Sequence, residues 1–145
     1  MLRKEKRVIL STGRKSLGDP MPEAVAEKIS AEAATLTKAT LRAAQELDIK
    51  NQVLATILGL SESTVSRMTK NKYFVERGRK DFELAALFVR LYRSLDAIVG
   101  GDQKVARSWL NNKNVVWRDA PINMIQTVTG LVDVINYLDT RRARI

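Results

Sequence analysis

One stretch of the sequence, residues 51–70 (NQVLATILGLSESTVSRMTK), places short hydroxyl and long basic side chains at a spacing suited to reading DNA. Arg67 is long enough to form two hydrogen bonds with a guanine edge, and Ser63 and Ser66 are short enough to approach bases or phosphates closely. Lysines at the end of the stretch suit backbone phosphates, which position a protein without specifying a base sequence. The predicted DNA-binding residues are Glu62, Ser63, Thr64, Ser66, Arg67, Lys70 and Lys72.

The composition excludes most catalytic chemistry, because the sequence contains no His and no Cys. A Ser-His-Asp triad, a thiolate nucleophile, a disulfide and a Cys-ligated zinc site are therefore impossible. Carboxylates remain, but they are scattered over the expected helices without a close pair for acid–base work. We predict no catalytic residue, no metal ligand and no cofactor, and hence a protein that is not an enzyme.

The polar stretch can read DNA only if two helices cross closely beneath it, and three residues meet that demand. Ala55 is small where the second helix would cross the first, Gly59 tolerates the positive φ of the turn, and Val65 is a branched apolar residue facing the first helix. Ser61 stands where an N-cap is wanted, with a hydroxyl able to accept from an amide two or three residues later. Two short helices joined through a glycine occur in many all-α proteins, but the joint match favours a helix-turn-helix.

Apolar residues three or four apart predict helices along nearly the whole chain. Because no segment has a convincing alternating pattern, the predicted fold class is all-α. The first helix is expected to begin at Pro22 or Glu23, and Asn51 is predicted to cap the helix that follows it. Residues 70–80 lack a helical period and are expected to form an exposed loop, whose basic side chains continue the phosphate-binding surface.

The second half of the chain is also predicted to be helical. A long amphipathic helix is expected to end at Gly100, and Asp102 can cap the short helix after it. Pro121 opens two further helical segments, which Gly130 is expected to separate. We divide the chain into a basic N-terminal arm (1–20), a helix-turn-helix DNA-binding domain (21–80) and a small helical C-terminal domain (81–145).

The formal net charge of +9 favours a polyanionic partner, because each neutralised phosphate releases condensed counterions. The excess is clustered, since residues 1–20 and residues 61–80 each hold six basic and two acidic side chains. No apolar run approaches the roughly 18 residues needed to cross a bilayer, and no signal peptide is recognisable. We therefore expect a cytoplasmic, nucleoid-associated protein that makes no membrane contact. It would bind operator DNA as a homodimer whose recognition helices lie about 34 Å apart, or a multiple of that.

Residues 100–138 carry a second pattern, GGDQKVARSWLNNKN followed by Pro121 and TVTGLVDVINYL. This pattern resembles the C-terminal domain of Xre/MbcA/ParS-type antitoxins, in which a Gly-Asp pair leads to an Ala and a Trp-Leu-Asn element, and then to a Pro-led helix and a terminal helix. The matching positions are Gly101, Asp102, Ala106, Trp109, Leu110, Asn112 or Asn114, Pro121, Thr129, Gly130, Val134 and Leu138, with Arg90 and Leu91 upstream. With the helix-turn-helix, the resemblance covers most of residues 36–140. One departure is Trp117-Arg118-Asp119-Ala120, where many relatives have a glycine shortly before the proline.

The resemblance implies an antitoxin with two partners. Its C-terminal domain would be toxin-binding and would cover the active-site entrance of a cognate RES-domain toxin that consumes NAD, while its N-terminal domain would repress the shared operon. Tyr and Arg are enriched at interface hot spots. The predicted toxin-binding residues are therefore Tyr137, Arg141, Arg142 and Arg144, for which a basic terminus in open solvent is the alternative.

A stand-alone transcriptional regulator is the competing interpretation of the whole chain. Its C-terminal domain would only dimerise or sense a small molecule, with Trp109 and Trp117 lining a pocket or a self-interface. For Trp109 we favour packing against Leu110 and the terminal helix, because Trp side chains are usually largely buried.

Overall fold

The computed structural model describes residues 23–143, with side chains from residue 31 onward. Within this range the helices are α1 (Glu23–Glu46), α2 (Asn51–Leu58), α3 (Glu62–Thr69), α4 (Lys80–Ile98), α5 (Gln103–Asn111), α6 (Pro121–Met124) and α7 (Val128–Arg142). The only extended pairing in the described range is an isolated antiparallel bridge between Asn114 and Asp119. The predicted all-α fold is confirmed. The predicted arm 1–20 and Arg144 lie outside the described residues.

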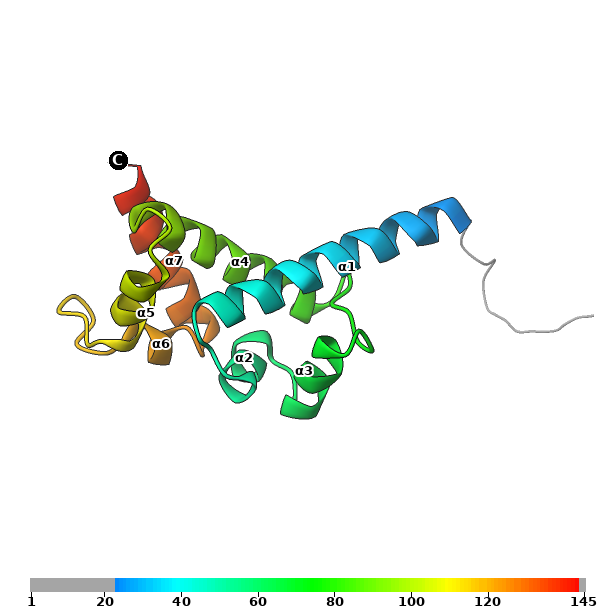
Figure 1. Cartoon of the computed structure of the whole chain (residues 1–145), viewed down its shortest axis with the longest axis horizontal. Helices are drawn as coiled ribbons and strands as arrows, with labels where there is room; N and C mark the ends of the chain where they lie inside the picture. The colour runs from blue at the N-terminus through cyan, green and yellow to red at the C-terminus, as the bar shows by residue number, and fades with distance from the viewer. Residues whose placement is uncertain (1–22, 144–145) are drawn as a thin grey trace, which may run out of the picture.

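The long helix α4 organises the molecule. It packs against α1, α2, α5 and α7. Figure 1 shows α2 and α3 below the paired helices α1 and α4, with α5, α6 and α7 grouped at the end away from the start of α1. One continuous buried cluster joins both groups, since it contains Val65 of α3, Phe88 of α4 and Leu131 of α7. None of the described helices is both long enough and apolar enough to cross a membrane.

The connection between α1 and α2 differs from the sequence prediction. Asp48 adopts the left-handed conformation with φ +57°, which turns the chain sharply after α1. The residue before α2 is Lys50, whose backbone is extended and whose side chain makes no capping hydrogen bond. The helix therefore begins one residue earlier than expected, and the prediction that Asn51 caps it is wrong because Asn51 already lies within the first turn.

The junction between α4 and α5 agrees with the sequence prediction. Gly100 and Gly101 both have positive φ, at +62° and +80°, so the chain leaves α4 through a conformation that glycine adopts without strain. The Asp102 side chain then accepts a hydrogen bond from the Val105 amide at 3.2 Å. This N-cap fixes the start of α5.

Gly130 does not separate two helices. It lies in the first turn of α7, and its amide donates to the hydroxyl of the N-cap residue Thr127 at 3.0 Å. A Cβ atom at this position would stand 1.9 Å from the Met124 carbonyl oxygen. The prediction is therefore wrong, and the glycine is needed because the backbones of α6 and α7 meet closely there.

The 70–80 segment joins α3 to α4 without a helix, as predicted, but it is not exposed throughout. Val75 is completely buried, and its amide donates to the Thr37 hydroxyl of α1 at 3.0 Å. The basic side chains of the 70–80 segment remain on the surface. The segment is consequently fastened to α1 at its centre, and the expectation of a fully exposed loop is wrong at Val75.

Candidate functional site

The crossing of α2 and α3 has the geometry that the sequence predicts. Gly59 follows α2 with φ +70°, so the chain turns in a conformation that favours glycine. Ala55 and Val65 are 4% and 0% exposed and belong to the same buried cluster, and α2 and α3 pack against each other. Leu54, Leu58 and Met68 complete the same core. Burial of one face of α3 leaves the opposite face for a partner.

A group of hydroxyls surrounds the N-terminus of α3. The Ser61 Oγ accepts a hydrogen bond from the Thr64 amide at 3.1 Å, which confirms it as the N-cap. The same oxygen lies 3.1 Å from the Ser63 Oγ and 2.8 Å from the Thr64 Oγ1. These short side chains stand beside the free amides of a helix N-terminus, an arrangement that suits an approaching phosphate.

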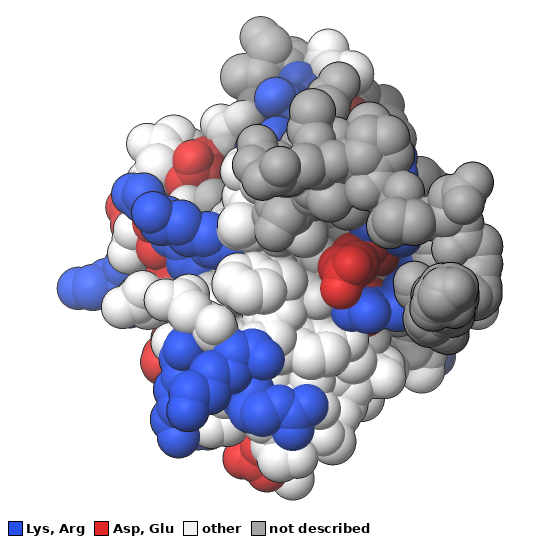
Figure 2. All heavy atoms as spheres, turned by 90° about the vertical axis from the view of Figure 1, so that its right-hand side faces the viewer, with Lys and Arg blue, Asp and Glu red and all other residues white. Residues whose placement is uncertain are grey.

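The predicted DNA-binding residues lie on the outer side of α3 and the turn after it. Glu62, Ser63, Arg67, Lys70 and Lys72 are exposed, whereas Thr64 and Ser66 are half-buried. Figure 2 views the molecule from the right-hand end of Figure 1 and shows Lys and Arg side chains gathered low on this face, at the height of α3. The polar edge of α3 is thus accessible and bordered by positive charge.

The backbone fixes the two predicted phosphate-binding lysines relative to Arg67. The Arg67 carbonyl oxygen accepts hydrogen bonds from the Lys70 amide at 3.1 Å and from the Lys72 amide at 2.8 Å. Between them Asn71 adopts a left-handed φ of +59°. The end of α3 is therefore a closed turn, and the three basic side chains project from one rigid segment.

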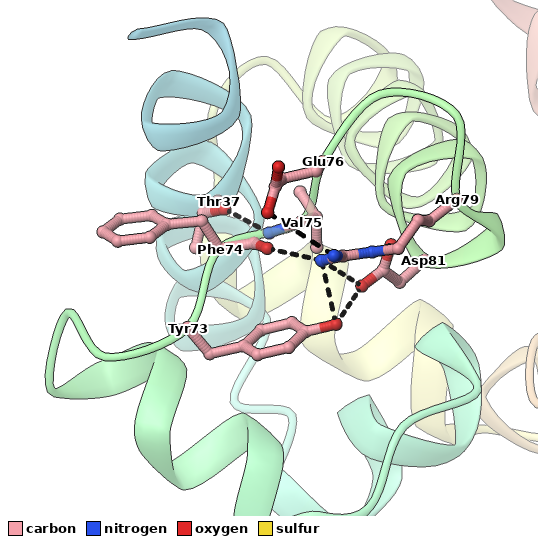
Figure 3. Close-up of polar contacts among 7 residues, drawn as sticks. All are labelled: Thr37, Tyr73, Phe74, Val75, Glu76, Arg79 and Asp81. Atoms are coloured by element: carbon pink, nitrogen blue, oxygen red, sulfur yellow. Dashed lines mark hydrogen bonds and ion pairs between the residues drawn. The ribbon is translucent and has the colours of Figure 1, made fainter. Parts of the chain in front are cut away.

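Sequence reasoning missed the polar network that holds the 70–80 segment against α4. Figure 3 shows the Arg79 guanidinium pointing toward the Tyr73 hydroxyl, the Phe74 carbonyl and the Asp81 carboxylate. Arg79 donates to Tyr73 Oη at 3.1 Å and to the Phe74 oxygen at 2.9 Å, and its Nε lies 3.4 Å from Asp81 Oδ1. The hydrogen bond to Asp81 raises the pKa of the Arg79 guanidinium, and burial raises the pKa of the Tyr73 phenol.

Two basic residues of this segment are thus engaged within the protein. Arg79 belongs to the network just described, and Arg77 forms a bidentate pair with Glu32 of α1 at 2.8 and 2.6 Å. Both pairings hold the segment in place, and they leave fewer donors for phosphates than the sequence suggests. No signal in the sequence indicated this, because the burial of the Asp81 carboxylate, which is 5% exposed and as a charged group requires a partner, is known only from the structure.

A second cluster, which we call the aromatic cluster, joins α5, α7 and the loop before α6. The Trp109 and Tyr137 rings stack with centroids 6.2 Å apart, and the Trp117 ring meets Tyr137 edge-on at 4.9 Å. The Arg141 guanidinium carbon lies 4.8 Å from the Tyr137 ring centroid. Trp109 therefore packs against the terminal helix, as predicted. A groove of about 310 Å³ opens beside it, lined by Leu95, Ile98, Val99, Val105, Leu138 and Arg141.

The remaining predicted residue of α7, Arg142, lies apart from Tyr137 and Arg141. Its guanidinium donates to the Ser94 hydroxyl of α4 at 3.4 Å. Nearby, Asp139 accepts from Ser94 at 2.8 Å and pairs with Arg90 at 2.5 Å. Burial alone would raise the pKa of Asp139, but the Ser94 hydroxyl and the Arg90 guanidinium outweigh it and lower that pKa. Arg142 thus helps to join α7 to α4.

Two family profiles match the chain. Residues 29–90 match the antitoxin Xre-like helix-turn-helix domain, and residues 94–144 match the antitoxin Xre/MbcA/ParS C-terminal toxin-binding domain. The chain belongs to the Xre/MbcA/ParS-type antitoxins. The resemblance stated from the sequence is confirmed, as is the order of the helix-turn-helix and the toxin-binding domain. Comparison with curated proteins gave no significant match.

Among the residues whose side chains the structure describes, most of the large apolar side chains on the surface lie within the toxin-binding domain. Among the described residues, the exposed large apolar side chains are Phe74, Val105, Val115, Val116, Val128 and Val132. All but Phe74 belong to residues 94–144, and Val115 is 92% exposed at the tip of the loop before α6.

Proposed function

We propose that this antitoxin neutralises a cognate RES-domain toxin that degrades NAD, and that it represses its own operon through α3. The observation that carries the toxin part is the joint position of Tyr137 and Arg141 in the matched toxin-binding domain, where the ring of one supports the guanidinium of the other. Tyr and Arg are among the side chains enriched at interface hot spots. The proposed toxin-binding residues are Tyr137, Arg141, Arg142 and Arg144.

The charge of these residues supports obstruction of the toxin rather than imitation of NAD. A pocket that holds the phosphates of NAD is expected to be cationic, so arginines would be repelled from its interior. They would instead pair with carboxylates around the entrance while the end of α7 blocks it. Because Tyr137 is held by Trp109 and Trp117, little side-chain entropy is lost on binding.

The DNA part of the proposal rests on the exposed edge of α3. Arg67 would read a guanine edge, the hydroxyls of Ser63, Thr64 and Ser66 would contact bases or phosphates near the helix N-terminus, and Lys70 and Lys72 would contact phosphates. Glu62 at the start of α3 would contribute to the choice of DNA sequence, either by accepting a hydrogen bond from a base or by repelling phosphates. Repression by two such helices requires a homodimer, and the site of action would be the nucleoid within the cytoplasm.

Co-expression of the antitoxin with the neighbouring gene, followed by purification and an assay of cellular NAD, tests the toxin part. The wild-type antitoxin should co-purify with the neighbouring protein and preserve NAD. Arg141→Glu should leave NAD depleted, because it reverses a charge at the rim. Lys38→Glu makes the same charge change at an exposed position of α1, outside the toxin-binding domain, and should protect fully.

Three outcomes would contradict the proposal. Full protection by Arg141→Glu would remove this side chain from the toxin contact, provided that the variant unfolds at the wild-type temperature. A neighbouring protein that leaves NAD intact when it is expressed without the antitoxin would exclude a RES-type activity. A chain that binds DNA but has no protein partner encoded beside it would instead be the stand-alone regulator.

A further inference from the structure

Tyr73 occupies a central position between the recognition helix and α4. The Arg67 guanidinium carbon lies 5.9 Å from the centroid of its ring, and the Arg79 guanidinium carbon lies 5.4 Å from it. The Tyr73 hydroxyl donates to Asp81 Oδ2 at 2.5 Å, and Asp81 is buried at the start of α4. One half-buried aromatic side chain therefore contacts the predicted base-reading arginine at its ring and the protein core at its hydroxyl.

We propose that Tyr73 is a positioning residue for Arg67, which restricts the arginine to the conformations that reach a base edge. This inference rests on the proposed DNA binding of α3. Tyr73 itself need not touch DNA. Its ring attracts the guanidinium by a cation–π contact, and this reduces the number of rotamers that Arg67 must give up on binding.

The ring can act in this way because both ends of Tyr73 are held. Its hydroxyl is fixed by Asp81 and by a 3.1 Å hydrogen bond from Arg79. Its backbone belongs to the segment that Val75 fastens to Thr37 of α1. The ring thus keeps its place relative to α3 when no DNA is bound, as a preorganised contact requires.

The two arginines beside the ring have different tasks. The donors of Arg79 are used by the Phe74 carbonyl, the Asp81 carboxylate and the Glu76 carboxylate at 3.4 Å, so Arg79 holds the segment together. Arg67 makes one side-chain hydrogen bond, to the Thr64 hydroxyl at 3.5 Å, and its side chain is exposed. Of the two, only Arg67 keeps most of its donors for a base.

A double-mutant cycle between Arg67 and Tyr73 tests the inference. The probe is a DNA duplex that the wild-type protein selects from a random-sequence pool, and the reference is a shuffled duplex of the same composition. Affinities are measured for the wild type, Arg67→Ala, Tyr73→Leu and the double variant, with thermal unfolding of each. Tyr73→Phe separates the contribution of the ring from that of the hydroxyl, because it keeps the ring and removes the hydroxyl.

We expect Tyr73→Leu to lower the preference for the selected duplex by about two- to fivefold, the range of an exposed cation–π contact. The loss should vanish when Arg67 is already Ala, since the ring then has no guanidinium to position. Tyr73→Phe keeps the ring but loses the hydrogen bonds to Asp81 and Arg79, so we expect it to lower the preference less than Tyr73→Leu does. A loss of the same size in both arginine backgrounds would overturn the inference, because Tyr73 would then act without Arg67.

If Tyr73→Leu does not fold, an NMR measurement on the wild-type protein still tests the inference. The side-chain protons of Arg67, assigned by comparison with Arg67→Lys, should show upfield ring-current shifts in the NMR spectrum without DNA. Random-coil shifts would overturn the inference, whatever the variants do. If the wild type selects no sequence, or if Arg67→Ala keeps full selectivity, the proposed DNA reading is wrong. The inference about Tyr73 is then wrong as well, because it depends on that reading. If Arg67→Ala loses selectivity but the losses of Arg67→Ala and Tyr73→Leu simply add in the double variant, the DNA reading by Arg67 stands and only the role of Tyr73 is excluded.

Discussion

The Tyr92 hydroxyl of α4 donates a hydrogen bond to the Glu46 carboxylate in the last turn of α1. Glu46 also accepts from Arg42 at 2.9 Å, and the Arg107 Nε donates to the Glu46 carbonyl at 2.7 Å. The Tyr92 and Arg42 hydrogen bonds lower the pKa of Glu46, and the bond to Glu46, together with burial, raises the pKa of Tyr92 to about 12. These contacts join α1, α4 and α5 at a single point.

The ionisation of Tyr92 gives a prediction for alkaline pH. Its pKa in the folded protein is above the unfolded value of about 10, so the contact stabilises fully below pH 10 and is lost as the pH rises toward 12. Absorbance titration of the phenols should therefore show a late step near pH 12. Tyr92→Phe should remove that step, and its free energy of unfolding should fall less steeply than that of the wild type between pH 10 and 12. A late step that persists in Tyr92→Phe would assign it to another tyrosine.

Gly130→Ala should destabilise the protein. Alanine improves helix propensity by about 1 kcal/mol, but its methyl group would lie 1.9 Å from the Met124 carbonyl oxygen, and a backbone shift of that kind costs about 1–3 kcal/mol or more. We expect a net loss of about 1–2 kcal/mol, measured by urea unfolding. Thr129→Ala, at the exposed neighbouring position, is the control and should change stability by less than about 0.5 kcal/mol. Equal stability of Gly130→Ala and wild type would contradict the close approach of α6 and α7.

Ser61→Ala should weaken the recognition helix. It removes the N-cap acceptor for the Thr64 amide, a loss of about 1 kcal/mol. Ser63→Ala removes a neighbouring hydroxyl that caps no amide, and it should be close to neutral in stability. Hydrogen exchange of the α3 amides distinguishes the two variants, because only Ser61→Ala should speed it.

Arg67→Ala and Lys72→Ala should affect DNA binding differently. Loss of a base contact at Arg67 should cost about 1–3 kcal/mol on the selected duplex and much less on shuffled DNA. Loss of a phosphate contact at Lys72 should weaken both duplexes alike and lower the salt dependence by about one counterion. Affinities measured at several salt concentrations check both expectations. Equal losses on the two duplexes for Arg67→Ala would remove it from base reading.

The crossing of α2 and α3 was predictable because its requirements lie within eleven positions of the chain. A small residue, a positive φ and a branched apolar residue at 55, 59 and 65 satisfy local steric demands, and the structure meets each of them. Capping by Ser61 and Asp102 was predictable for the same reason. Asn51 was misassigned because the left-handed turn at Asp48 moves the start of α2, and sequence patterns fix element boundaries poorly.

Contacts between distant residues were not predictable from the pattern of helices. Thr37 and Val75 are separated by 38 positions, and nothing in either local sequence indicates that one hydroxyl fastens the 70–80 segment. The aromatic cluster likewise combines Trp109, Trp117 and Tyr137 from separate elements. Tyr137 and Arg141 were chosen as interface residue types, and their contact with each other is known only from the structure.

The helix α4 belongs to both matched segments, since one ends at residue 90 and the other begins at 94, within Lys80–Ile98. Leu91 and Leu95 beside this border are buried in the common core. A chimera that joins the first half of this antitoxin to the second half of a relative would thus splice two helices of different sequence. Such recombinants should fold only when all of α4 comes from one parent together with the residues that pack around it.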